Sequence, residues 1–300
     1  MFKPLVSVII CTYNRSSYLG CCLESLNIQT YSNYEIIVVN GPSTDTTDLV
    51  LSAYPHIKKL RQETLSGLSA ARNLGLRTVS GEIIAFIDDD AIADKNWLEN
   101  LVLAYDNEAI GGVGGPVFEI TGTWYQFKNG YISRAGIPSF INEKDMEFND
   151  PLGEYFNYIM GTNASFRKDI LFQIGLFDEN YRYYLDETDV CVQIIKHGYK
   201  IKHIDNAVVY HEMAEGHNRS SPYDINYSEI LKNVVYFILK NFNSGSASSI
   251  RLPVSAMLYW IRIDYLNLKQ GNITLYNFMK TFFKIMWGSF SGYSLAIKTL

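Results

Sequence analysis

Three short, mostly apolar runs constrain the fold of this chain most strongly. They are VSVIIC (6–11), EIIVV (35–39) and EIIAFI (82–87), and each is followed by a stretch with the periodicity of a helix. Strands that are apolar on both sides are typical of parallel sheets covered by helices. Their alternation with helices therefore predicts an α/β domain with a Rossmann-like, mostly parallel sheet flanked by helices.

Weaker patterns place the remaining elements. Residues 121–158 are rich in loop-forming and aromatic residues. Ser43 or Thr44 is expected to cap the helix over 44–54. From residue 227 onward the pattern is helical, with breaks at NSGSASS (243–249) and KQGN (269–272) that separate about three helices. We expect further strands at 56–61, 201–204 and 207–210, and helices at 18–29, 44–54, 66–78, 97–105, 168–174 and 188–196.

The patterns divide the chain into two parts. The βα alternation ends near residue 110, and a glycine-rich, β-like stretch, GGVGGPVFEI, opens a second half with fewer helices. We therefore expect one main α/β domain over 1–215, with halves at 1–110 and 111–215, and a helical C-terminal region over 216–300.

Composition excludes several classes of protein. The chain has 26 Lys and Arg against 31 Asp and Glu, a net charge of −5, without the basic excess of a nucleic-acid-binding protein. No run of about 18 uncharged apolar residues predicts a membrane-spanning helix, and the N-terminus resembles a first strand more than a signal peptide. The four cysteines match no zinc or disulfide framework, which indicates reduced thiols in a cytoplasmic protein.

Polar residues follow three of the predicted parallel strands. In such sheets the ligand crevice lies beyond the carboxyl ends of the strands. That rule places three groups around one crevice: Thr12, Tyr13 and Arg15; Asn40; and the triplet Asp88, Asp89 and Asp90.

The acidic triplet suggests a metal ion. Adjacent carboxylates repel one another unless a cation lies among them, and Asp88 and Asp90 can share a divalent ion such as Mg²⁺ or Mn²⁺. A solvated helix N-terminus explains the triplet alone about equally well, because acids there interact favourably with the helix dipole. The position at a strand end favours the metal interpretation.

Taken together, the motifs resemble the family 2 glycosyltransferases, which have the A-type nucleotide-sugar fold. The resemblance covers roughly residues 4–215 in the correct order and is more specific than a lone DxD motif. It rests on the segments VSVIICTYNR, VVNGPSTDTT, LSAARNLGL, GEIIAFIDDDA, GTNASFRKDILFQIGLFDE and DETDVCVQIIKHGYK.

This resemblance implies a nucleotide-diphosphate sugar donor and a divalent cation, Mn²⁺ or Mg²⁺. Asp90 would ligate the metal directly, Asp88 would contact the ribose or sugar as well as the metal site, and Asp89 would be the variable middle residue. His211, at the end of a predicted strand, corresponds to a further metal ligand in such enzymes, although a lone histidine is more often structural. The halves 1–110 and 111–215 would then bind the donor and the acceptor.

The resemblance also assigns the donor pocket. Tyr13 would stack on the nucleobase or form part of the crevice wall, beside Thr12 and Arg15. Asn40 stands where the family often has an aspartate that accepts a hydrogen bond from the nucleobase. Because of this departure, the identity of the nucleobase is not predicted. Arg72 would either contact the donor or pair with carboxylates of the crevice.

The second acidic group, in YYLDETDVC, would supply the base of an inverting transfer. The family motif is Glu-Asp, and here the order is Asp186-Glu187, which gives the role to Glu187 by position, with Asp186 as the alternative. Both residues also precede a predicted helix, where acids commonly act as caps. By resemblance, Gly161, Thr162 and Asn163 would line the acceptor side; Trp97, Trp124 and Tyr131 are candidates for sugar stacking or for the core.

We therefore expect an inverting glycosyltransferase that moves a monosaccharide to a hydroxyl of a glycan or a lipid-linked saccharide, in polysaccharide or glycoconjugate biosynthesis of the cell envelope. The segment QIIKH (193–197) lacks the QxxRW motif of membrane-embedded polymerases. Two other functions stay open: a non-catalytic relative that binds a glycan or a partner, and a sugar-phosphate nucleotidyltransferase, which the absence of a glycine-rich first loop disfavours.

The C-terminal segment FMKTFFKIMWGSF (278–290) bears on location. Lys280 and Lys284 lie among large apolar residues, a pattern compatible with a helix at a membrane surface. A helix packed on the catalytic domain explains it slightly better. We accordingly expect a cytoplasmic protein, with peripheral contact at the inner face of the membrane as the alternative.

Overall fold

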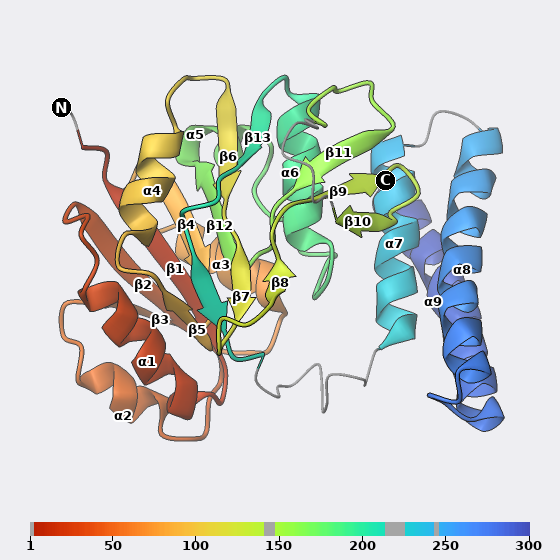
Figure 1. Ribbon diagram of the computed structural model, residues 1–300, viewed down its shortest axis with the longest axis horizontal. Helices are drawn as coiled ribbons and strands as arrows, with labels where there is room; N and C mark the ends of the chain where they lie inside the picture. The colour runs from red at the N-terminus through yellow and green to blue at the C-terminus, as the bar shows by residue number, and fades with distance from the viewer. Residues whose placement is uncertain (1–2, 141–147, 214–225, 243–245) are drawn as a thin grey trace. The chain divides into compact units, whose positions relative to one another are not determined.

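The predicted parallel strands form the centre of a seven-stranded sheet (Figure 1). In the computed structural model, which describes residues 3–140, 148–213, 226–242 and 246–300, the sheet order is β13-β6-β12-β4-β1-β2-β3. Neighbouring strands from β4 to β3 are parallel, whereas β12 runs antiparallel to both β4 and β6. The seven strands are β1 (Val6–Thr12), β2 (Tyr34–Asn40), β3 (Lys58–Arg61), β4 (Ile83–Ile87), β6 (Ile110–Gly114), β12 (Asn163–Arg167) and β13 (Lys200–His203).

Helices cover both faces of this sheet (Figure 1). They are α1 (Ser16–Asn27), α2 (Thr47–Ser52), α3 (Leu68–Leu76), α4 (Trp97–Ala104), α5 (Lys168–Gln173) and α6 (Asp186–Lys196). Gly175, with φ +91°, and Gly198, with φ +87°, follow the ends of α5 and α6, where left-handed backbone is common. The predicted cap of α2 is wrong: the helix begins at Thr47, and the Ser43 side chain instead donates to Asn40.

Short strands build two smaller sheets. A four-stranded sheet in the order β5-β14-β7-β8 contains β5 (Ala91–Ala93), β14 (Val209–His211), β7 (Val117–Glu119) and β8 (Tyr125–Phe127). A three-stranded sheet in the order β10-β9-β11 contains β9 (Gly130–Ser133), β10 (Pro138–Phe140) and β11 (Tyr155–Tyr158). The prediction that 121–158 is loop-rich therefore missed four strands, each of three or four residues, which are too short to show periodicity.

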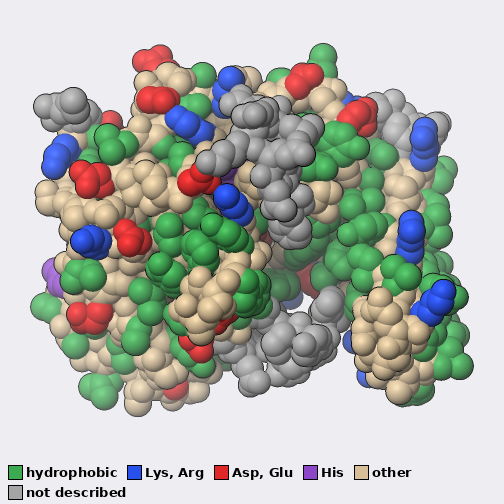
Figure 2. Space-filling view, viewed as in Figure 1, with side chains coloured by type: hydrophobic (Ala, Val, Ile, Leu, Met, Phe, Trp, Pro, Cys, Tyr) green, Lys and Arg blue, Asp and Glu red, His purple; other side chains and the backbone are tan. Residues whose placement is uncertain are grey.

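The C-terminal region is helical, as predicted. It contains α7 (Tyr227–Phe242), α8 (Ser246–Lys269) and α9 (Leu275–Thr299). The break predicted at 269–272 lies between α8 and α9; of the break predicted at 243–249, the first three residues lie outside the described part and α8 already begins at Ser246. Lys and Arg side chains lie along the visible side of α8, with hydrophobic side chains beside them (Figure 2). Within the described residues, no helix combines the length and the apolar character needed to cross a membrane.

The chain separates into two compact units. The sheet unit comprises 1–131, 140–182 and 186–216, and the helical unit comprises 132–139, 183–185 and 217–300. In the helical unit, α7 packs along α9, and Asn233 of α7 donates to the backbone oxygen of Tyr183 at 2.5 Å. The helical unit thus includes two segments from before residue 216, which sequence pattern alone assigned to the main domain.

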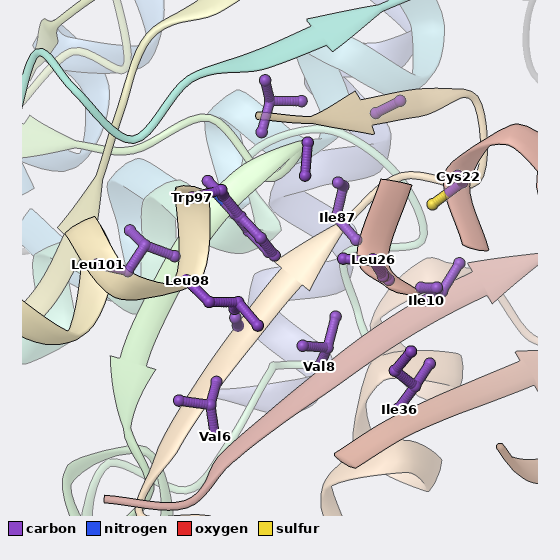
Figure 3. Close-up of a cluster of buried hydrophobic side chains, with 14 of the residues drawn as sticks. Val6, Val8, Ile10, Cys22, Leu26, Ile36, Ile87, Trp97, Leu98 and Leu101 are labelled. Carbon is purple, nitrogen blue, oxygen red and sulfur yellow. The ribbon is translucent and has the colours of Figure 1, made fainter. Parts of the chain in front are cut away.

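The core of the sheet unit lies between one face of the sheet and two helices (Figure 3). Val8 and Ile10 of β1 point to this side and pack with Leu26 of α1 and Trp97 of α4, all fully buried. Alternate residues of β1 face α3 on the other side of the sheet. Because the central strands are buried on both faces, their carboxyl ends are fixed, and the turns that follow them can hold polar side chains in defined positions.

Candidate active site

The acidic triplet forms a turn between two strands. Asp88, Asp89 and Asp90 follow β4 and precede β5, and the next helix, α4, begins only at Trp97. The backbone N–H of Ala91 donates to the backbone carbonyl oxygen of Asp88 at 3.2 Å and closes the turn. The interpretation of the triplet as a helix N-terminus is therefore wrong.

His211 lies directly beside this turn. It ends β14, where it pairs with Ala91 of β5. One ligand atom from each of Asp88, Asp90 and His211 lies within 4.8 Å of the others. His211 Nε2 is 3.0 Å from Asp90 Oδ1 and 3.9 Å from Asp88 Oδ2. Carboxylate oxygens suit Mg²⁺ and Mn²⁺, and imidazole nitrogen is a common metal ligand, so this donor set fits a divalent metal ion.

Gln126, a residue of β8, contacts the other nitrogen of the same histidine. Its Oε1 lies 2.7 Å from His211 Nδ1. An amide oxygen only accepts, so this contact places a proton on Nδ1 and directs Nε2 toward Asp90 and Asp88. Nothing in the sequence marks Gln126, because it lies in a segment without periodicity and belongs to no motif.

Arg15 supplies positive charge to the triplet. Its Nη1 donates to Asp89 Oδ1 at 3.0 Å and to Asp90 Oδ2 at 2.9 Å. Asp89 is only 3% exposed, and burial, with smaller contributions from the two neighbouring aspartates, raises its pKa to about 7 against the effect of Arg15. Asp89 thus anchors Arg15 inside the fold, a role that the sequence did not predict for either residue.

Two adjacent residues connect the triplet with the second acidic group. Thr162 Oγ1 donates to Asp88 Oδ2 at 2.6 Å. At Gly161, a Cβ atom would lie 2.5 Å from Arg72 Nη2 and 3.3 Å from Glu187 Cδ. Neighbouring Cα atoms are only about 3.8 Å apart, so the candidate metal ligands and the candidate base border the same small space.

The second acidic group is organised by Arg72. The guanidinium of Arg72, in α3, donates to Asp186 and lies 3.7 Å from Glu187 Oε2, both at the start of α6. It also lies over the rings of Phe86, at 5.6 Å, and Phe177, at 5.2 Å. Of the two alternatives for Arg72, the structure shows the pairing with crevice carboxylates.

The two carboxylates differ in access. The Asp186 side chain is 2% exposed and that of Glu187 is 21% exposed. Burial and the neighbouring Asp186 raise the pKa of Glu187 well above the ordinary value, while Arg72 opposes the shift. Glu187 is therefore the carboxylate that solvent or a substrate hydroxyl can reach.

The residues predicted to bind the nucleotide are largely buried or engaged in contacts within the protein. Thr12 is buried at the end of β1, and Tyr13 packs so closely on Gly41 that a Cβ there would lie 3.1 Å from its ring. Asn40 is 2% exposed; its Oδ1 accepts from Ser43, and its Nδ2 donates to Asp48 at 2.7 Å. The contacts of Tyr13 and Asn40 with a nucleobase remain predictions.

Asn163 has a different place from the one expected. It is fully buried, its Oδ1 accepts from Trp97 Nε1 at 2.8 Å, and its Nδ2 donates to the backbone oxygens of Pro116 and Ala207. It therefore joins β12 to α4 and two loops and does not line the acceptor side with Gly161 and Thr162. Trp97 is likewise a core residue, whereas Trp124 is 49% exposed.

Comparisons with known proteins agree on one family. The family model described as glycosyl transferase family 2 matches residues 7–175. Glycosyltransferase AglE of Haloferax volcanii is 33% identical over 180 residues, which cover 58% of this chain and 56% of AglE. The glucosyl-dolichyl phosphate glucuronosyltransferase of the same organism is 28% identical over 234 residues, 70% of each chain. The matched region thus spans little more than half of the length of AglE.

A solved structure shows the same fold. The mannosyltransferase PcManGT from Pyrobaculum calidifontis, in complex with GDP-Man and Mn²⁺, superposes with a TM-score of 0.61 at 16% identity, over 99% of this chain and 88% of that one. This likeness confirms the predicted class of fold, a mostly parallel sheet flanked by helices with a helical C-terminal region.

Proposed function

The chain belongs to glycosyl transferase family 2, and from this premise we propose that it is an inverting, metal-dependent glycosyltransferase. It would move a monosaccharide from a nucleotide-diphosphate sugar to a hydroxyl of a glycan or lipid-linked saccharide, in the assembly of a cell-envelope polysaccharide or glycoconjugate. The observation that carries the proposal is the close approach of two acidic groups, one with a metal-ligand donor set, on either side of Gly161 and Thr162.

The first acidic group is suited to hold the donor. Asp88, Asp90 and His211 would bind Mn²⁺ or Mg²⁺, and the bound cation would offset the charge that develops on the leaving diphosphate. Thr162 fixes the Asp88 carboxylate by its hydrogen bond, and Gln126 orients His211. Arg15 holds Asp90 by a further hydrogen bond, so the chain itself orients all three candidate ligands.

The Arg15 side chain completes the donor pocket in this proposal. It is bonded to Asp89 and Asp90 and is 22% exposed, a position at the crevice wall from which its exposed part can meet an anionic donor. Tyr13 would stack on the base, while Thr12 and Asn40 would shape its pocket. The identity of the nucleobase is not assigned, because both polar groups of the Asn40 side chain are engaged by Ser43 and Asp48.

Glu187 is the general base that we propose. It is more exposed than Asp186, and Asp186 is held by Arg72 and is suited to position the base. A base must be ionised to accept the proton of the acceptor hydroxyl. Because the pKa of Glu187 is raised, a larger fraction of the enzyme becomes competent as pH rises, and the transfer rate should increase over the range in which Glu187 ionises.

Donor binding tests the first half of the proposal. We would measure binding of a panel of nucleotide sugars by calorimetry with and without Mn²⁺, and donor hydrolysis alongside it. We expect metal-dependent binding of one donor that Asp90→Ala abolishes and that Glu108→Ala leaves unchanged. Glu108 is exposed and precedes β6, at the opposite end of the strands from the triplet. Binding that ignores Mn²⁺ and Asp90 would contradict the proposal; release of nucleoside triphosphate with pyrophosphate would indicate a nucleotidyltransferase.

Transfer tests the second half. We expect Glu187→Gln to keep donor affinity within about twofold and to lower transfer by at least ~100-fold, the usual contribution of general-base catalysis. The rise of rate with pH should disappear in this variant. Unchanged transfer would move the role to Asp186, and donor binding without transfer to any saccharide acceptor would favour a non-catalytic binding protein.

Location is part of the same proposal. All four cysteines are free thiols, which is ordinary in the reducing cytoplasm. We propose a cytoplasmic protein whose lipid-linked acceptor is presented at the inner face of the membrane, and no nucleic-acid partner.

A further inference from the structure

Helix α9 carries exposed apolar side chains on the side opposite its packing surface. Ile285, Gly288, Ser289, Gly292 and Ala296 are buried, and α9 has its most extensive contact with α7. At 100° per residue, these five lie on one side of the helix. The opposite side carries what we call the apolar stripe: Tyr276, Met279, Phe283, Trp287 and Phe290, exposed by 76%, 44%, 64%, 65% and 66%.

The spacing shows that the stripe is continuous. Its members follow one another at intervals of three or four residues, the period of one helix face. Isolated exposed apolar residues are ordinary, but a row of three large aromatic residues and a methionine beside a tyrosine is a contiguous patch that indicates an interaction surface. In the same unit, α8 exposes a second row at intervals of four and seven residues: Ile250, Val254, Leu258 and Tyr265.

The charge of these two helices is opposite to that of the remainder of the chain. Residues 246–300 contain six Lys and Arg and one acidic residue, Asp264, which gives a net charge of +5. Residues 1–245 contain 20 Lys and Arg and 30 Asp and Glu, which gives a net charge of −10. Lys280 lies three residues before Phe283 and Lys284 three residues before Trp287, so both lysines border the stripe. None of the six basic side chains forms an ion pair with a carboxylate of the described residues.

We propose that the apolar stripe of α9 docks on an anionic lipid surface, with Lys280 and Lys284 at the headgroups. Large apolar residues enter the boundary between headgroups and acyl chains, and basic residues beside them are attracted by anionic lipids. The stripe would lie in the plane of the membrane surface, which requires no spanning helix. A symmetric contact between two copies is disfavoured, because it would bring together two stripes that are each bordered by Lys280 and Lys284.

We rest this inference on the proposed function in one respect: a lipid-linked acceptor would be presented at the surface on which the stripe docks. The interaction itself is independent of donor and metal, and its test contains neither. Vesicle binding without donor binding would therefore overturn the proposed function alone, and donor binding without vesicle binding would overturn this inference alone.

The experiment is co-sedimentation of the full chain with vesicles of phosphatidylcholine, and with vesicles of equal parts phosphatidylcholine and phosphatidylglycerol. We expect binding to the second kind, at least tenfold weaker binding to the first, and weakening by added salt. Phe283→Ser with Trp287→Ser should reduce binding at least tenfold. Lys280→Gln with Lys284→Gln should reduce it about 30-fold, since each basic residue near an anionic surface strengthens binding about fivefold.

The matched control replaces two equally exposed leucines of the sheet unit, Leu49→Ser with Leu103→Ser, which are 70% and 65% exposed. This control should sediment as the parent does, and circular dichroism should show the same helix content in all variants. No binding to anionic vesicles, or equal binding by the Phe283 and Trp287 variant, would overturn the proposal. A parent dimer that this variant converts to a monomer, without vesicle binding, would assign the stripe to a second copy.

Discussion

The acidic turn shows how single residues keep like charges together. Asp88, Asp89 and Asp90 follow one another, and each has a partner. The Thr162 hydroxyl contacts Asp88, Arg15 contacts both Asp89 and Asp90, and His211 also contacts Asp90. These contacts reduce the repulsion between the carboxylates. They also leave one potential ligand atom each of Asp88, Asp90 and His211 close to the others. The positions of the ligand atoms are thus set before any cation arrives, which lowers the reorganisation that binding requires.

The contact of Gln126 with His211 gives the first prediction. In Gln126→Leu, the imidazole loses the acceptor that fixes its Nδ1 proton, and the ring is free to turn or change tautomer. We expect Mn²⁺ affinity, measured by calorimetry without donor, to fall about tenfold, the lower end of the usual effect of such supporting residues. Gln126→Glu, which keeps an acceptor at the same reach, is the control and should retain affinity. Equal affinity in the leucine variant would show that Gln126 does not orient the ligand.

The close approach at Gly161 gives the second prediction. A methyl group there would lie 2.5 Å from Arg72 Nη2, and Arg72 is held by Asp186 and by two aromatic rings. We expect Gly161→Ala to displace this guanidinium and to reduce transfer by at least tenfold, about 1.4 kcal/mol of activation free energy.

The control for this substitution is Gly20→Ala. Among the described residues, no heavy atom outside the neighbouring backbone of α1 lies within 4 Å of a Cβ at Gly20, which is in the interior of that helix. Transfer should be unchanged there, and the free energy of unfolding should rise by about 0.5–1 kcal/mol, since alanine favours a helix. Full transfer activity in the Gly161 variant would mean that Arg72 can move without consequence.

At the scale of elements, the sequence predicted the central strands and little of the small sheets. VSVIIC, EIIVV and EIIAFI are apolar on both sides because helices cover both faces of the sheet, and that burial is visible as an unbroken apolar run. β7, β8 and β14 are only three residues long, and their side chains are divided between core and site. Nothing local distinguishes Gln126 in β8 from a loop residue.

The candidate site was predictable to the same degree. Asp88 and Asp90 follow a strong strand and form a recognisable motif, and His211 and Glu187 followed from the resemblance. The pairing of Arg15 with Asp89, and the burial of Asn163 beside Trp97, depend on contacts between residues 66 or more positions apart. Such contacts are decided by packing in three dimensions, which a single sequence does not record.

A buried acid between the C-terminal helices gives the third prediction. Asp264 of α8 is 4% exposed; Tyr227 of α7 donates to its Oδ1 at 3.5 Å, and its Oδ2 has no hydrogen-bond partner among the described residues. Burial raises its pKa, and hydrogen bonds from Tyr227 and Thr281 only partly oppose this. The folded state therefore binds a proton at the Asp264 carboxyl more tightly than the unfolded state does, in which an aspartate has a pKa near 3.9.

The sign of the pH effect follows directly. For a group whose pKa is raised on folding, the contribution to stability is fully present below the unfolded pKa and is lost as pH rises through the folded one. Asp264→Asn does not ionise, and it therefore avoids the cost of burying a charged carboxylate. We expect its unfolding free energy at pH 7 to exceed that of the parent by about 1 kcal/mol, with the difference disappearing below about pH 4. Denaturant unfolding at both pH values measures it.

The control is Asp205→Asn, whose side chain is 58% exposed beside Lys128. It should show no gain in stability at pH 7. An Asp264→Asn variant that is less stable than the parent at neutral pH would indicate that the ionised carboxylate, and not its burial, is what the helical unit requires.

For the whole molecule, the division of function between the two units is the main consequence of the fold. All candidate metal ligands, the candidate base and Arg72 belong to the sheet unit, whereas the apolar stripe and the positive charge belong to the helical unit. The metal ligands themselves come from segments 121 residues apart, the turn after β4 and the end of β14. A cation bound there would link these two segments of the sheet unit.

Hydrogen exchange with and without Mn²⁺ tests this division. A ligand that binds only the folded state stabilises it by RT ln(1 + [L]/Kd), about 2.7 kcal/mol at a concentration of ~100 Kd. Local opening that separates residues 88–90 from β14 would be suppressed by up to that amount, so amide exchange there should slow by up to about 100-fold. Exchange in α8 and α9 should be unchanged, and Asp90→Asn should remove the effect in β14. Equal slowing in the helical unit would show that metal binding is transmitted to it, and no slowing in β14 would show that His211 takes no part in holding the ion.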